Sequence, residues 1–126
     1  PPALLRILGS PGGALFGHDP TDLPVIFDSS STLPQPGSWV GILFGNAAQA
    51  GSFLDFARIG HAGQAGFGAN AAVDIAGVGA PLSITNSVFS DNARGDIFVS
   101  CIAQLLENVF TGNVFGIGEV LEQNCD

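Results

Sequence analysis

The chain has 126 residues, the size of one domain with its own core, so we expect a single domain over residues 1–126. Eleven Asp and Glu residues stand against three Arg and no Lys, for a formal charge of −8. This balance argues against nucleic acid and anionic membrane surfaces as partners, because a polyanion is bound by clustered cations.

Short β-strands are the elements that the sequence predicts. Eighteen Gly and eight Pro are scattered along the chain, and no long window keeps a helical period of apolar residues. Runs rich in Val, Ile, Leu and Phe are separated by turn-forming residues, and none is long and uninterrupted enough to predict membrane insertion. In chain order, the expected strands are Leu4–Leu8, Leu23–Phe27, Val40–Phe44, Phe53–Ile59, Ala72–Ile75, Leu82–Phe89, Ile97–Val99, Gln104–Phe110 and Ile117–Leu121.

Two segments in the second half of the chain repeat one another. "ITNSVFSDN" at 84–92 and "LLENVFTGN" at 105–113 share Val-Phe and a closing Asn at an offset of 21 residues. A period of about 20 residues predicts one structural unit stacked on the next, with like side chains in columns. The predicted core columns are Phe89 over Phe110 and Ile84 under Leu105, and the predicted turn ladder is Asn92 with Asn113.

Pairs of alternating apolar residues extend the repeat upstream. The pair Val73 and Ile75 precedes the pair Ile97 and Val99 by 24 residues, and Ile42 precedes Val73 by 31 residues. A period that stretches where loops are inserted is typical of solenoids and not of sandwiches.

Four segments carry a resemblance to a known family: "LPVIFDSS" at 23–30, "PQPGSWVGILFG" at 34–45, "GSFLDFARIGHAG" at 51–63 and "GAPLSITNSVFSDNARGDIFV" at 79–99. In their order they resemble the successive coils of right-handed parallel β-helix proteins, pectate-lyase-like, from bacterial secreted and cell-surface proteins. The resemblance implies an all-β solenoid, and coils of 21 to 31 residues divide a chain of 126 residues into about five coils. It implies no single activity, because this fold serves lyases, hydrolases, adhesins and structural proteins.

The sequence predicts no catalytic, cofactor or metal site. The two histidines, His18 and His61, are 43 residues apart without a second ligand at metal-binding spacing. The acidic residues expected in strands and turns, including Asp55 and Asp74, do not form the carboxylate pair that glycoside hydrolysis needs. Residues 94–96 read Arg-Gly-Asp, a tripeptide that some adhesion proteins use, but we interpret them as a turn running into a strand.

Cys101 and Cys125 are 24 residues apart, close to one coil, so the fold can bring them within bonding distance. A disulfide would fix the C-terminus to the body of the domain, and the alternative is a pair of buried thiols. The chain also has no Met and begins Pro-Pro, so we expect a processed or excerpted form of a longer precursor.

These patterns favour a non-enzymatic structural subunit. Apolar residues make up 46 % of the chain and charged residues 11 %, and a short stack of coils has two open ends that can template further copies. We therefore expect a homo-oligomer or homopolymer, joined through coil ends or a terminal strand, in an extracellular filament or cell-surface assembly. The alternative is a carbohydrate-binding or carbohydrate-active β-helix with a polysaccharide as its partner.

Overall fold

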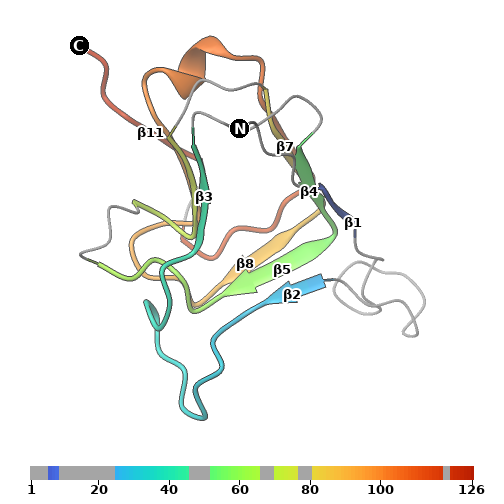
Figure 1. Ribbon diagram of the computed structural model, residues 1–126, viewed down its shortest axis with the longest axis vertical. Coiled ribbons are helices and arrows are strands. Elements are labelled where there is room, and N and C mark those ends of the chain that lie inside the picture. The colour runs from blue at the N-terminus through green and yellow to red at the C-terminus, as the bar shows by residue number, and fades with distance from the viewer. Residues whose placement is uncertain (1–5, 9–24, 46–51, 66–69, 77–80, 118–119) are drawn as a thin grey trace.

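A computed structural model describes residues 6–8, 25–45, 52–65, 70–76, 81–117 and 120–126 (Figure 1). This part of the chain is all-β, with strands of two to four residues and a single turn of 3-10 helix, η1. The elements are β1 (Arg6–Leu8), β2 (Val25–Phe27), β3 (Ile42–Phe44), β4 (Phe53–Asp55), β5 (Ala57–Gly60), β6 (Val73–Ile75), β7 (Ser83–Thr85), β8 (Val88–Ser90), β9 (Ile97–Val99), η1 (Ala103–Leu105), β10 (Val109–Thr111) and β11 (Leu121–Glu122).

The strands form three sheets, and every strand pairing in them is parallel. The first sheet has the order β1-β4-β7-β10, the second β2-β5-β8 and the third β3-β6-β9-β11. We call three successive strands, one from each sheet, a rung. Among the described residues, the last rung has β10 and β11 but no named strand in the second sheet. Val114, which lies between β10 and β11 in the chain, takes that place through an isolated bridge to Val88. Figure 1 shows the three sheets on three sides of a common interior.

Successive rungs lie in register, so that inward-facing residues form columns. In the first sheet the column is Leu54, Ile84 and Phe110. Most of the buried apolar side chains belong to such columns, and they fill the space between the three sheets. The other columns are Phe27, Ile59, Phe89 and Phe115 in the second sheet, and Ile42, Val73, Ile97 and Val120 with Phe44, Ile75 and Val99 in the third.

A tight corner between the first and second sheets recurs in each of the last three rungs. Its first residue is left-handed each time: Phe56 at φ 51°, Asn86 at φ 50° and Gly112 at φ 72°. Gly and Asn adopt this conformation readily, whereas a bulky residue such as Phe56 does so at a cost of roughly 1 kcal/mol. The sharp change of direction explains why the expected strands Phe53–Ile59 and Leu82–Phe89 are each divided in two.

The predicted repeat upstream is confirmed. Val73 pairs with Ile97 and Ile42 pairs with Val73 in the third sheet, at the spacings that the sequence indicated. The expected strand Gln104–Phe110 is only partly correct, because its first residues form η1. Most of the segment at 4–8 is described as β1, and residues 4 and 5 lie outside the described part of the chain.

The predicted core columns at the C-terminal end are wrong. Phe110 lies beside Ile84 in the first sheet, while Phe89 belongs to the second sheet and stacks on Phe115 with ring centroids 5.6 Å apart. Leu105 lies in η1 with 84 % of its surface exposed. The dipeptide Val-Phe occurs three times in the sequence, and the copy that continues Val88-Phe89 is the one at 114–115.

Candidate functional site

Asn92 and Asn113 do not form the predicted ladder with each other. The Asn92 side chain reaches back to the preceding rung, where its Oδ1 accepts a hydrogen bond from the Ala62 N–H (2.9 Å) and its Nδ2 donates to the Ile59 carbonyl (3.1 Å). A buried backbone group without a partner is costly, and Asn92 satisfies two of them at once.

Asn113 repeats this arrangement one rung further on. Its Oδ1 accepts from the Ser87 N–H (2.9 Å), and its Nδ2 donates to the Ile84 carbonyl (2.8 Å). In both cases the two backbone groups are three residues apart. We call Asn92 and Asn113 the asparagine clamps. Sequence reasoning missed a related residue, Asn108, whose Oδ1 accepts from the Leu82 N–H at 2.9 Å.

The carboxylate of Asp96 is buried and fully engaged. It accepts hydrogen bonds from Asn92 Nδ2 at 3.0 Å and from the N–H groups of Gly116 and Ile117 at 2.8 and 2.9 Å. Asp96 therefore links the Asn92 clamp to the last rung through hydrogen bonds. An Arg-Gly-Asp adhesion motif presents its carboxylate to a receptor, and this carboxylate is not accessible.

The other acidic residues of the strands are held apart. Asp55 lies on β4 and accepts from Thr85 Oγ1 (2.8 Å) and Asn86 Nδ2 (3.0 Å). Asp74 lies on β6 in the third sheet, where its Oδ2 accepts from the N–H and side chain of Asn70 and its buried Oδ1 has no hydrogen-bond partner. Within the described residues, no three His, Cys, Asp or Glu side chains are placed to hold a metal ion.

His61 follows the C-terminal end of β5 and lies between two acidic residues that follow β2 and β8. His61 Nδ1 lies 2.7 Å from Asp28 Oδ1, and its Nε2 lies 3.9 Å from Asp91 Oδ2. Burial raises the pKa of Asp28. Hydrogen bonds from His61 and from the Ser29 N–H, together with the nearby charges of His61 and Arg58, lower this pKa by more than burial raises it. The pKa of Asp28 is therefore lowered from its ordinary value. His18 lies outside the described residues.

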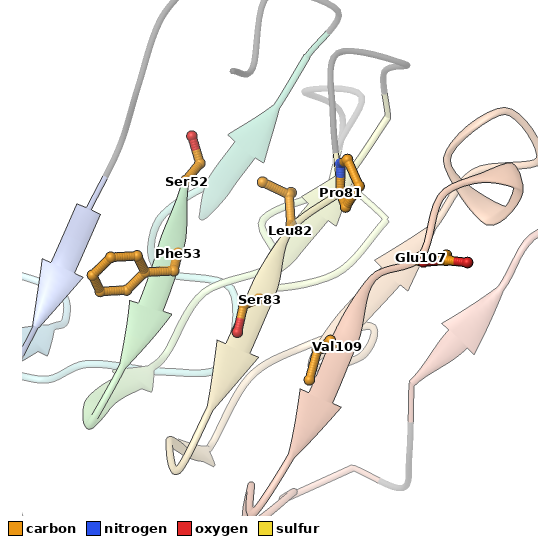
Figure 2. Close-up of a pocket in the computed structure, with 7 residues that line it drawn as sticks. All are labelled: Ser52, Phe53, Pro81, Leu82, Ser83, Glu107 and Val109. Atoms are coloured by element: carbon orange, nitrogen blue, oxygen red, sulfur yellow. The ribbon is translucent and has the colours of Figure 1, made fainter. Parts of the chain in front are cut away.

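An open groove of about 200 Å³ runs over the outer face of the first sheet (Figure 2). Its floor is the row of Phe53, Ser83 and Val109, which are neighbours in register on β4, β7 and β10. The rest of the lining is Ser52, Pro81, Leu82 and Glu107. The groove is mostly apolar, with the carboxylate of Glu107 and the two hydroxyl groups of Ser52 and Ser83 along it.

Both ends of the stack of rungs carry apolar side chains. Within the described residues, β10 and β11 have a partner strand on one side only, and so do β1, β2 and β3. Both end rungs carry apolar side chains that pack against the core but remain partly exposed. These are Phe27, Trp39 and Ile42 at the N-terminal end and Phe110, Phe115 and Val120 at the C-terminal end.

The predicted pair Cys101 and Cys125 forms a disulfide. Its two residues are 24 positions apart, and it holds the segment that follows β11 against the turn that follows β9. Gln123 strengthens this attachment, because its N–H donates to the Val99 carbonyl and its Oε1 accepts from the Cys101 N–H, both at 2.9 Å. The last strand is therefore fixed on the stack covalently and through the backbone.

No helix in the described part of the chain is long and apolar enough to cross a membrane. Comparison of the chain with protein-family models, with curated proteins and with solved structures finds no match. The resemblance to β-helix proteins therefore stays a prediction.

Proposed function

We propose that the chain is a right-handed parallel β-helix that acts as a structural subunit and associates with further copies through the ends of its stack. The observation that carries the proposal is the set of apolar columns that end, partly exposed, at both end rungs. Three parallel sheets visited in cyclic order support the β-helix. Right-handed winding follows from the strong preference of parallel crossovers for that hand.

The end rungs combine two features that favour association. Among the described residues, the strands of each end rung have a partner strand on one side only, so their other edge can pair with a further strand. Each end rung also presents apolar side chains, and burying them removes apolar surface from water at about 25 cal/mol per Å². A short stack has a large share of its surface in its two ends, so this contribution weighs heavily in a chain of 126 residues.

The disulfide supports an extracellular or cell-surface setting, because such bonds persist in oxidising compartments. It also supports a structural role. The bond keeps the last rung in place, and the last rung is the surface that a second copy would meet.

Sedimentation equilibrium tests this proposal. The weight-average mass should rise above 12.8 kDa with protein concentration. It should rise more steeply at high salt, because salt screens the repulsion between chains of charge −8. Val114→Asp places a charge on the exposed last rung and should weaken association. Ser83→Asp adds the same charge within the third rung and should leave it unchanged. A mass of 12.8 kDa at every concentration and salt would refute the proposal.

The groove on the first sheet favours a second candidate, a carbohydrate-binding domain. Phe53 offers an aromatic face for sugar stacking, and Ser83 and Glu107 offer hydrogen-bonding groups. Calorimetric titration with neutral and acidic polysaccharides tests it. Wild type should bind and Phe53→Ala should not, with Leu33→Ala, an exposed loop position, as the control. Absence of heat in wild type would eliminate this candidate.

A further inference from the structure

We propose that the copies join head to tail, in a register that continues the sheets from one chain into the next. In this arrangement β10 pairs with β1 of the next copy, the Val114 segment with its β2, and β11 with its β3. The inference rests on the proposed self-association and specifies its polarity, its register and the residues that meet.

The interior columns support this register. Phe115 ends the column that Phe27 begins, and Val120 ends the column that Ile42 begins. All four side chains are partly buried and pack against the core. Placing the last rung on the first rung of the next copy puts Phe115 over Phe27 and Val120 over Ile42. Apolar columns would then run through the junction without interruption.

The outer faces of the end rungs match in the same register. On the second sheet the row that begins with Ile26, 59 % exposed, ends with Val114, 55 % exposed. On the third sheet the row that begins with Leu43, 62 % exposed, ends with Leu121, 40 % exposed. Head-to-tail stacking brings these exposed apolar residues together in pairs. At the corresponding places the second rung holds Arg58 and Asp74, and the third rung holds Val88 and Phe98.

The backbone of β10 is compatible with a parallel junction, and the match of the apolar columns selects the polarity. The Val109 N–H donates to the Leu82 carbonyl, and the Thr111 carbonyl accepts from the Asn86 N–H, so both residues point toward β7. Backbone groups alternate in direction along a strand, and those of Phe110 therefore point to the open side. A parallel partner requires the next copy to have the same orientation, which makes its first rung the match. Such a junction uses two different surfaces and repeats without closing.

One residue opposes the junction. The register places Glu122 in line with Val99, Ile75 and Phe44, so it would face Phe44 of the next copy. An acidic residue in an apolar column blunts a strand edge, because burying an unpaired charge is costly. Glu122→Val should therefore lower the concentration needed for association by about tenfold or more. A matched Glu107→Val, on the rim of the groove, should not.

Cysteine pairs test the register directly. Wild type has no free thiol among the described residues. Neighbouring residues on parallel strands are about 4.8 Å apart, within reach of a disulfide. Leu43→Cys chains mixed with Leu121→Cys chains should form a mixed disulfide under mild oxidation. Leu43→Cys or Leu121→Cys alone should not, and Ser83→Cys mixed with Leu121→Cys should not.

The outcomes separate this inference from the proposed function. Chains that associate in sedimentation but link like with like, or link Ser83→Cys to Leu121→Cys equally well, would overturn the head-to-tail register and leave self-association intact. Chains that stay at 12.8 kDa in every condition would overturn both. Selective linkage of Leu43→Cys to Leu121→Cys, together with stronger association of Glu122→Val, would support it.

Discussion

Asn92→Ala removes the Asn92 clamp and leaves every residue of the apolar columns in place. Asn92 is 2 % exposed and makes three hydrogen bonds, to the Ala62 N–H, the Ile59 carbonyl and Asp96 Oδ1. The substitution leaves these groups without that partner. Each buried group left unsatisfied costs about 1 to 3 kcal/mol. Because Asp96 keeps its hydrogen bonds from the Gly116 and Ile117 N–H groups, we expect a loss of about 3 to 5 kcal/mol in the free energy of unfolding.

Urea unfolding followed by Trp39 fluorescence measures this loss. Trp39 is the only Trp, and its Nε1 donates to the Gly60 carbonyl at 2.7 Å, so unfolding changes its surroundings. The total stability of a domain is about 5 to 15 kcal/mol, so the variant should unfold at a much lower urea concentration.

Two further variants make the prediction specific. Asn113→Ala removes the second clamp, which is half-buried at the end of the stack. The free energy of unfolding should fall by only about 1 to 2 kcal/mol, because water can replace the lost side chain. Asn92→Asp keeps an acceptor but sets a second carboxylate against Asp96, and should be no better than Asn92→Ala. A loss below about 1 kcal/mol for Asn92→Ala would refute the clamp.

Three other predictions concern the core, acid stability and the disulfide. Phe89→Ala, 1 % exposed, should lose about 3 to 5 kcal/mol in urea unfolding and exposed Leu105→Ala less than about 0.5 kcal/mol; equal losses would contradict the column assignment. The lowered pKa of Asp28 contributes stability above pH 3.8, and this stability is lost as the pH falls through the pKa of Asp28 in the folded state. Below pH 3.8, wild type should therefore lose stability more steeply than Asp28→Asn. Parallel curves of unfolding free energy against pH for the two proteins would contradict this. Replacing both Cys101 and Cys125 by Ser opens a 24-residue loop and should cost about 3 kcal/mol in thermal unfolding, and an unchanged midpoint would count against it.

Much of the fold could be predicted from the sequence because parallel stacking leaves a periodic record. Val73 and Ile97 occupy the same place on successive rungs, so the spacing of aliphatic pairs predicted the third sheet correctly. The disulfide followed from the same reasoning, because its spacing of 24 residues matches the distance from Val73 to Ile97.

The first and second sheets could not be assigned in this way. Their strands are separated by corners of one or two residues, so Val88-Phe89 and Val109-Phe110 look equivalent in sequence although they belong to different sheets. Side-chain direction resets at each left-handed corner, and a shift in register changes which residues face inward. The third Val-Phe, at 114–115, is the true continuation of Val88-Phe89.

The candidate site was predicted only in outline. Asn92 and Asn113 were recognised as a pair, but their partners are backbone groups of the preceding rung, which the sequence does not specify. The Asp28 and His61 pair joins residues 33 positions apart and has no local signal. Open ends were expected from chain length and period and stay a prediction, whereas matching the residues of the end rungs required the register.

Stacking of successive rungs in parallel register underlies the core columns, the asparagine clamps and the proposed junction. Cross-strand nuclear Overhauser effects on isotope-labelled protein test it most directly. Parallel register predicts backbone contacts that connect β10 with β7 at Phe110 and Ile84, and β9 with β6 at Ile97 and Val73. Strong Hα–Hα contacts typical of antiparallel pairs, or pairing of β10 with β8, would contradict it.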